Sequence, residues 1–163
     1  MQAVVIAGPK KSGKTTLLSL VAEMLERRGK KVAVVKYSNH PLEHDNTDAF
    51  WLRRPNRTVV SVAPGETVAF WPEELSFESL VAHLEADVVL LEGGDAPLRV
   101  PRVLCLPEDA EDAEAYMEEA RSFTLVATVG GVAAIAGEPY FPETDPVAAE
   151  NIATLVLERG LKV

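Results

Sequence analysis

The chain has 163 residues, of which 47% are apolar and 25% charged, the balance of a globular protein with one sizeable core. The formal net charge of −9 argues against a nucleic-acid partner, because phosphate backbones bind basic surfaces, and no apolar stretch approaches the ~20 residues that cross a bilayer. Cys105 is the one cysteine, which excludes an intrachain disulfide; with an N-terminus that lacks a secretory signal pattern, this predicts a cytoplasmic protein.

The first predicted elements surround a glycine-rich loop. Residues 3–7 are an apolar run that predicts a strand, and G-x-x-x-x-G-K-T follows directly at residues 8–15. Apolar residues at helical spacing then predict a helix that ends near residue 28, with Gly29 as its C-cap. Strand, loop and helix in this order are the context of a phosphate-binding P-loop. The chain is therefore expected to bind a nucleoside triphosphate.

The residue types of this loop suit phosphate chemistry. Gly8 and Gly13 permit the tight wrap that points successive N–H groups at a β-phosphate, and the helix adds the positive end of its dipole. Lys14 is expected to reach the β/γ oxygens as a mobile charge, and Thr15 to ligate Mg²⁺. The other loop residues expected at the nucleotide are Lys10, Lys11, Ser12 and Thr16.

A second strand and a long polar loop come next. Residues 30–37 predict a buried parallel strand that completes a right-handed βαβ unit, and Lys36 near its carboxyl end is expected at the nucleotide. The segment 38–56 is polar, and its part from 47 to 54 is compatible with a short helix. Loops of this length in compact domains are usually functional or mobile.

This loop gathers histidine and aspartate, at His40, His44, Asp45 and Asp48. Asp45 is the carboxylate expected to ligate Mg²⁺ or to orient an attacking water. Contacts to a second substrate are an alternative use of the loop. A transition-metal site is another, although the spacing matches no tight metal signature.

Glu92 is the expected second acid of the site. Residues 87–92 predict a fully buried strand that ends in Glu92 and is followed by Gly93. Ligands of open α/β sheets bind at the carboxyl ends of strands, so Glu92 is expected to hold Mg²⁺ or its waters. Gly93 would let the backbone approach the ligand closely.

The remaining pattern defines the fold class. Two β-like runs around Pro64-Gly65 predict a hairpin over residues 58–71, and residues 77–86 predict a helix. Further elements are expected as strands at 102–106 and 124–129 and helices at 112–121 and 146–159, the last with Asp145 as N-cap. This alternation predicts a P-loop NTPase three-layer α/β fold with a mostly parallel sheet and an additional hairpin, as one nucleotide-binding domain over residues 1–163.

The base of the nucleotide is left open by these residues. Gly130-Gly131 follow a predicted strand on the ligand edge and are expected to approach the nucleobase. The N-K-x-D pattern by which many GTPases select guanine is absent, so neither GTP nor ATP is favoured by a base-reading motif.

With these motifs in place, the chain resembles the MobB family of molybdopterin-guanine dinucleotide biosynthesis proteins. The likeness rests on the P-loop with its following T-L-L, the strand ending in Lys36 with the His/Asp loop, D-V-V-L-L-E-G at residues 87–93, and Asp145-Pro146 before the last helix. The chain departs from the family pattern at Gly94-Asp95, where that family has Phe-Lys after E-G.

The resemblance implies a GTP-binding accessory protein with weak hydrolysis, a homodimer that acts with molybdopterin and the molybdopterin guanylyltransferase. Mg²⁺·GTP would be held by the P-loop, with slow attack by a water that Asp45 or Glu92 orients. A small-molecule kinase is an alternative, but beyond Arg121 only Arg159 is available for the arginine lid that such kinases carry. A P-loop ATPase switch is another, although Pro9 stands where the partitioning type has a signature lysine.

Overall fold

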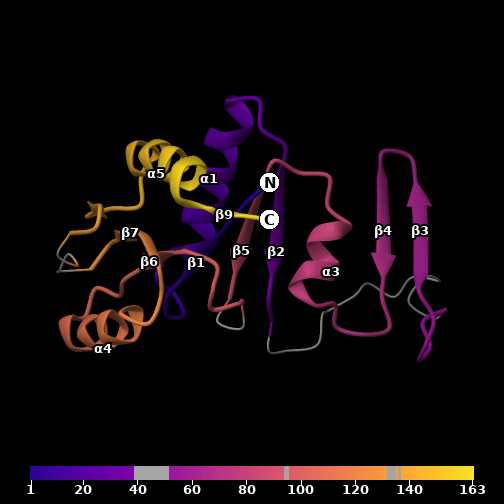
Figure 1. The fold of residues 1–163 in the computed structure, drawn as a ribbon, viewed down its shortest axis with the longest axis horizontal. Helices are drawn as coiled ribbons and strands as arrows, with labels where there is room; N and C mark the ends of the chain where they lie inside the picture. Colours follow the sequence, from indigo (N-terminus) through magenta and orange to yellow (C-terminus); the bar gives the residue numbers. More distant parts are fainter. Residues whose placement is uncertain (39–51, 94–95, 132–134, 136) are drawn as a thin grey trace. The chain divides into compact units, whose positions relative to one another are not determined.

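The computed structural model describes residues 1–38, 52–93, 96–131, 135 and 137–163 (Figure 1). Its contacts form two compact units, Met1–Tyr37 with Leu84–Val163, and Ser38–His83, and each is described by itself below. The single nucleotide-binding domain over residues 1–163 stays a prediction. Asp45, the two loop histidines and most of the helix suggested at 47–54 lie outside the described residues.

The first unit is built on a seven-stranded sheet whose strands follow the order β2-β5-β1-β6-β7-β8 among the described residues. These strands are β1 (Gln2–Ala7), β2 (Val32–Lys36), β5 (Val88–Glu92), β6 (Arg102–Cys105), β7 (Leu125–Val129) and β8 (Tyr140–Phe141). All neighbours along this path are parallel. A short strand β9 (Leu161–Lys162) pairs antiparallel with the start of β1. The carboxyl ends of the parallel strands therefore share one edge, and the P-loop and Glu92 both lie there.

Three helices cover the two faces of this sheet. Helices α1 (Lys14–Arg27) and α5 (Pro146–Arg159) lie side by side on one face, and α4 (Ala110–Ala120) lies on the other (Figure 1). The apolar stripe of α1 is fully buried at Leu17, Val21 and Leu25, which recur every four residues. The expected three-layer α/β fold with a mostly parallel sheet is therefore confirmed.

The last helix has the predicted boundaries. The Asp145 side chain accepts a hydrogen bond from the Ala148 N–H at 2.7 Å, and Pro146 occupies the first turn. Such a cap contributes about 1 kcal/mol to helix stability. The helix ends at Arg159, as the following Gly160 indicates.

Cys105 is a buried free thiol at the end of β6, as its apolar surroundings in the sequence indicate. Burial raises the pKa of this thiol from 9.0 to about 12, against the opposing effect of the positive charge on Lys14. The side chain therefore stays protonated at neutral pH and acts as a small apolar group.

Two features of the sheet in the first unit differ from the sequence prediction. Strand β2 is parallel as expected, but it forms the edge of the described sheet and is not buried, with Val34 52% exposed. A continuous apolar run does not distinguish a central strand from an edge strand, because that depends on which strand pairs beside it. The short strands β8 and β9 were also missed, since pairing, and not periodicity, defines strands of two residues.

The second unit contains the predicted hairpin, formed by β3 (Val59–Ala63) and β4 (Glu66–Phe70) in antiparallel register. Its turn has Pro64 followed by Gly65 with φ of 88°, the residue pair typical of a type II turn. Helix α3 (Phe77–Ala82) begins with Ser76, whose hydroxyl accepts from the Ser79 N–H at 3.2 Å, and it is shorter than the predicted 77–86. No helix within the described ranges is long and apolar enough to span a membrane.

Candidate phosphate-binding site

The loop after β1 has the backbone of a tight anion-binding turn. Gly8, Lys11 and Gly13 all have positive φ, of 139°, 68° and 81°. A Cβ at Gly8 would lie 2.2 Å from the carbonyl oxygen of Cys105, so only glycine fits where the loop passes over β6. The backbone and the neighbouring strand together therefore require glycine at this first position of the motif.

The side chains of the loop are held around one carbonyl. Ser12 Oγ donates to the Pro9 oxygen at 2.9 Å, and the Lys14 ammonium donates to the same oxygen. Among the described residues, no side chain caps the first turn of α1, whose N-cap is Gly13. The amide groups of that turn are therefore available to an anion, in the direction that the helix dipole favours.

Thr15 and Glu92 are brought together from positions 77 residues apart. The Thr15 hydroxyl donates to Glu92 Oε1 at 2.9 Å, and Lys36 Nζ lies 3.7 Å from the same oxygen. Strand register explains this arrangement, because Lys36 of β2 pairs with Glu92 of β5. Glu92 also shares the face of Val88 and Leu90, which pack in the same core as α1.

Glu92 is only 7% exposed, so its carboxylate depends on these partners. The next residue, Gly93, has φ of 127°, and a Cβ there would lie 2.8 Å from the Tyr37 carbonyl oxygen. The chain can therefore leave β5 beside the end of β2 only through a glycine. In this structure Gly93 thus closely approaches the backbone of Tyr37. The predicted approach of Gly93 to a ligand stays a prediction.

An open cleft of about 410 Å³ collects most of the predicted residues. It is lined by Lys10, Lys11, Gly13, Lys14, Thr15, Thr16 and Glu92. Gly8 lines a separate cavity of about 210 Å³, which Lys14 also lines. Three lysines with a hydroxyl and a carboxylate at one cleft suit a polyphosphate bound with a cation.

The donor set also fits a magnesium ion. Thr15 and Glu92 offer oxygen ligands, which Mg²⁺ prefers, and Mg²⁺ usually keeps several waters and takes few protein ligands. Over the parts of the chain that the structure describes, no group of three His, Cys, Asp or Glu side chains is placed to hold a metal ion. The alternative transition-metal site in the His/Asp loop lies outside those parts.

One residue of the smaller cavity has no counterpart in the sequence prediction. Arg102 is 2% exposed, donates to the Ala96 carbonyl oxygen at 3.1 Å and lies 4.1 Å from the Phe123 ring centroid. It lines the cavity together with Lys14 and Gly93. The sequence does show Arg102 as a charged residue at the start of an apolar strand. Its burial could not be predicted, because it depends on packing against Phe123, 21 residues later.

This sheet order, with the loop after β1 and the acid at the end of β5, defines an α/β protein of the P-loop NTPase type. The family model of "Molybdopterin guanine dinucleotide synthesis protein B", MobB, matches residues 3–130. The chain belongs to the MobB family, and membership implies a role in molybdopterin guanine dinucleotide biosynthesis.

Solved structures show the same fold. Bacillus subtilis MobB superposes with a TM-score of 0.75 at 20% identity, covering 95% of this chain and 98% of that one. A MobB homologue from Bacillus stearothermophilus gives 0.66 at 23% identity, with 97% of both chains covered. Another structure, described as molybdopterin-guanine biosynthesis protein B, gives 0.68 at 24% identity over 96% of this chain and 97% of that one. No curated protein sequence matches the chain.

Proposed function

We propose that this protein binds Mg²⁺·GTP in the cleft at the P-loop and acts as an accessory protein in the guanylylation of molybdopterin. The observation that carries the proposal is the hydrogen bond from Thr15 to the buried Glu92. Both residues line the cleft that Lys14 also lines. This is the arrangement in which a P-loop hydroxyl and a strand-end acid hold a metal ion against a triphosphate.

Each group has a role in this proposal. The loop amides and Lys14 bind the β- and γ-phosphates, while Lys10 and Lys11 add positive charge at the cleft. Thr15 and Glu92 hold Mg²⁺, which neutralises charge on the phosphates. Lys36 Nζ, 3.7 Å from Glu92 Oε1, pairs with this carboxylate and lies beside the ligand. The client enzyme would be a molybdopterin guanylyltransferase, with molybdopterin as its acceptor.

Weak hydrolysis is part of the proposal. Glu92 is engaged by Thr15 and Lys36, so it is a poor general base for an attacking water. Asp45 is the residue proposed to orient the water or add a metal ligand. Because Thr15 and Lys36 already engage Glu92, nucleotide turnover is expected to be slow and binding to dominate.

Calorimetric titration with GTP and ATP, each with Mg²⁺, tests this function, with phosphate release followed over hours. Preferred GTP binding with very slow release is the expected result. ATP binding that is equal or tighter, with rapid turnover, would contradict it and point to the kinase or ATPase alternatives. No binding of either nucleotide would remove the proposal altogether.

A homodimer is proposed as the working form, with the hairpin as a pairing surface. Val60 and Val62 of β3 share one face of the hairpin and are 57% and 77% exposed. A two-stranded hairpin is marginally stable by itself, and exposed valines on it suit burial against a second copy. Sedimentation equilibrium at micromolar concentration is expected to give twice the 17.7 kDa chain mass, and a particle of 17.7 kDa would exclude this dimer.

A further inference from the structure

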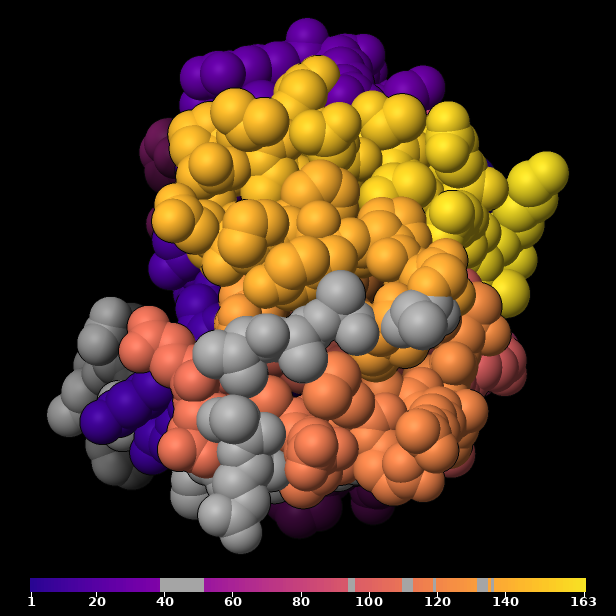
Figure 2. Space-filling model, turned by 90° about the vertical axis from the view of Figure 1, so that its left-hand side faces the viewer, coloured from indigo at the N-terminus to yellow at the C-terminus, as the bar shows by residue number. Residues whose placement is uncertain are grey.

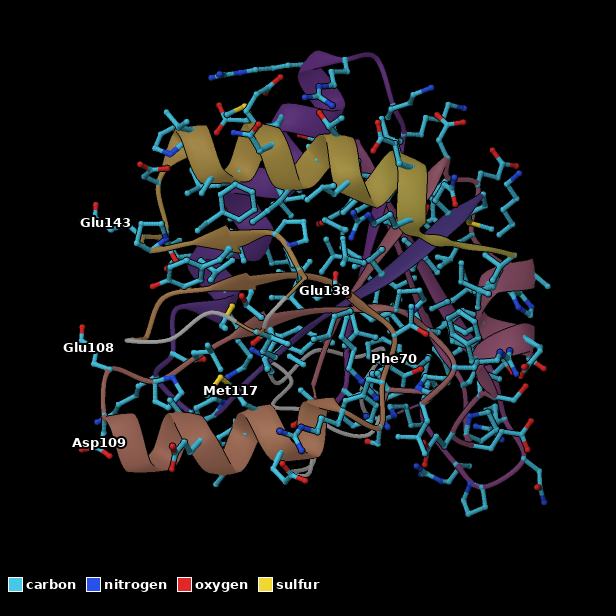
Figure 3. The ribbon with its side chains drawn as sticks, turned by 60° about the vertical axis from the view of Figure 1, so that its left-hand side comes forward. Phe70, Glu108, Asp109, Met117, Glu138 and Glu143 are labelled. Carbon is cyan, nitrogen blue, oxygen red and sulfur yellow. The ribbon has the colours of Figure 1, made fainter. Side chains whose placement is uncertain are left out.

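A larger cleft of about 660 Å³ opens beside the P-loop on the side away from Glu92. Lys10 to Gly13 form one wall, and the loops after β6, β7 and β8 form the others. The lining residues outside the P-loop are Leu106, Pro107, Glu108, Gly130, Gly131, Pro142, Glu143 and Thr144. Figure 2 looks onto the side of the molecule where α5 lies above and α4 below, and Figure 3 shows Glu108 and Glu143 at this edge, between the two helices.

The walls of this cleft are fixed by backbone contacts. The Gly130 N–H donates to the Phe141 oxygen at 2.8 Å, and Tyr140 Oη donates to the Gly131 oxygen at 3.0 Å. Gly131 has φ of 69°, and a Cβ there would lie 2.7 Å from the Leu106 Cβ. Gly130 and Gly131 therefore present backbone without side chains to the cleft, a surface against which a flat ring can lie.

The loop after β8 forms the wall of the cleft that contains Glu143. Thr144 lines the cleft together with Gly13, and its hydroxyl would lie 3.5 Å from a Cβ at Gly13, so this loop lies close to the P-loop turn. Asp145, one residue on, caps α5. Glu143 thus stands between β8 and the capped start of α5, in a loop that lines the cleft beside the P-loop.

The positive and negative side chains of the cleft lie on different walls. Lys10 and Lys11 belong to its P-loop wall, whereas Glu108 and Glu143 belong to the loops that face it. Neither carboxylate makes an ion pair or hydrogen bond within the described ranges. Two acids beside a site for polyphosphate would weaken binding by repulsion, unless they meet a part of the ligand that donates hydrogen bonds.

We propose that this cleft takes the purine nucleoside of the bound nucleotide and that the Glu143 carboxylate selects guanine. A carboxylate accepts two hydrogen bonds side by side. The guanine edge offers two donors, N1–H and the exocyclic amino group, whereas adenine presents an acceptor at N1 and is repelled. The inference deepens the proposed function, because it assumes nucleotide binding at the P-loop.

Glu143→Gln tests the proposal by calorimetry with Mg²⁺ complexes of GTP, ITP, ATP and inorganic tripolyphosphate. In the parent protein, affinity is expected to fall from GTP to ITP, which lacks the amino group, and further to ATP. A hydrogen bond to a charged group contributes enough that Glu143→Gln is expected to lower GTP affinity about 10- to 100-fold. The affinity ratio of GTP to ATP should fall in proportion, while tripolyphosphate affinity should stay within about twofold of the control, since removing one exposed charge changes it little.

Glu158→Gln is the matched control, since it makes the same charge change at an exposed position of α5 and outside the cleft. Equal GTP and ATP affinities in the parent, or an unchanged ratio in Glu143→Gln, would overturn the role of Glu143 while leaving phosphate binding intact. A parent that binds neither nucleotide nor tripolyphosphate would instead overturn the P-loop function itself, and the inference with it.

Discussion

Lys14→Ala is expected to abolish measurable binding of nucleoside triphosphate. Truncating one partner of a desolvated charge pair costs roughly 2–5 kcal/mol, which corresponds to about 30-fold to about 4,000-fold in affinity. We expect a loss near the upper end of this range for Lys14, because Lys14 lines both the 410 Å³ cleft and the 210 Å³ cavity at the P-loop. Its ammonium is already held over the loop by the Pro9 carbonyl, so little ordering is needed on binding.

The fold should survive this change. The Lys14 side chain is partly exposed at the first residue of α1, and alanine is a good helix former. Thermal unfolding of the variant should therefore match that of the parent within a few degrees, while calorimetry shows no heat of binding with Mg²⁺·GTP.

Lys30→Ala is the matched control for the charge. It removes the same positive charge in the turn after α1, near the opposite edge of the sheet, and should leave affinity unchanged. If Lys14→Ala binds GTP as tightly as Lys30→Ala does, the loop is not a phosphate-binding P-loop and the central proposal is wrong.

Glu92→Gln is expected to act on the metal and to leave much of the nucleotide affinity. A glutamine Oε1 still accepts the Thr15 hydroxyl, so the packing at the end of β5 is kept. The charge that attracts Mg²⁺ is lost. Changes of ligands or their partners typically cost 10- to 100-fold in metal affinity, and the Mg²⁺ concentration for half-maximal GTP binding should rise by about that factor.

The measurement is GTP affinity as a function of Mg²⁺ concentration, for the parent, for Glu92→Gln and for the control Glu114→Gln on the exposed surface of α4. In the absence of Mg²⁺, Glu92→Gln should bind GTP at least as well as the parent, since a negative charge near the phosphates is removed. A Mg²⁺ dependence equal to that of the control would show that Glu92 does not contact the metal or its waters.

Features that depend on neighbours in the chain were predicted correctly from the sequence. The order of strand, glycine-rich loop and helix located the P-loop, since loop geometry and helix propensity act over a few residues. Asp145, Pro146 and Gly160 marked both ends of α5, because capping is also local. Burial of the four apolar residues 88–91 of β5 followed directly from their apolar run.

The place of Glu92 at a strand end is evident from the sequence, but its partners depend on the sheet. Two separate parallel pairings, β1 with β5 and β2 with β5, bring Lys36 and Thr15 to the same carboxylate. The burial of Arg102 against Phe123 likewise needs the packing of a distant segment.

The amino-acid sequence by itself determined the glycine-rich loop between β1 and α1, the order of the main elements and the likeness to the MobB family. These features depend on residues close in the chain or on a pattern along it. The tertiary structure alone decided that β2 lies at the edge of the described sheet, that β8 and β9 exist, and that three loops enclose a cleft with Glu143 on its wall. Strand order, short pairings and clefts arise from contacts between residues far apart in sequence, and no local propensity records which segments will meet.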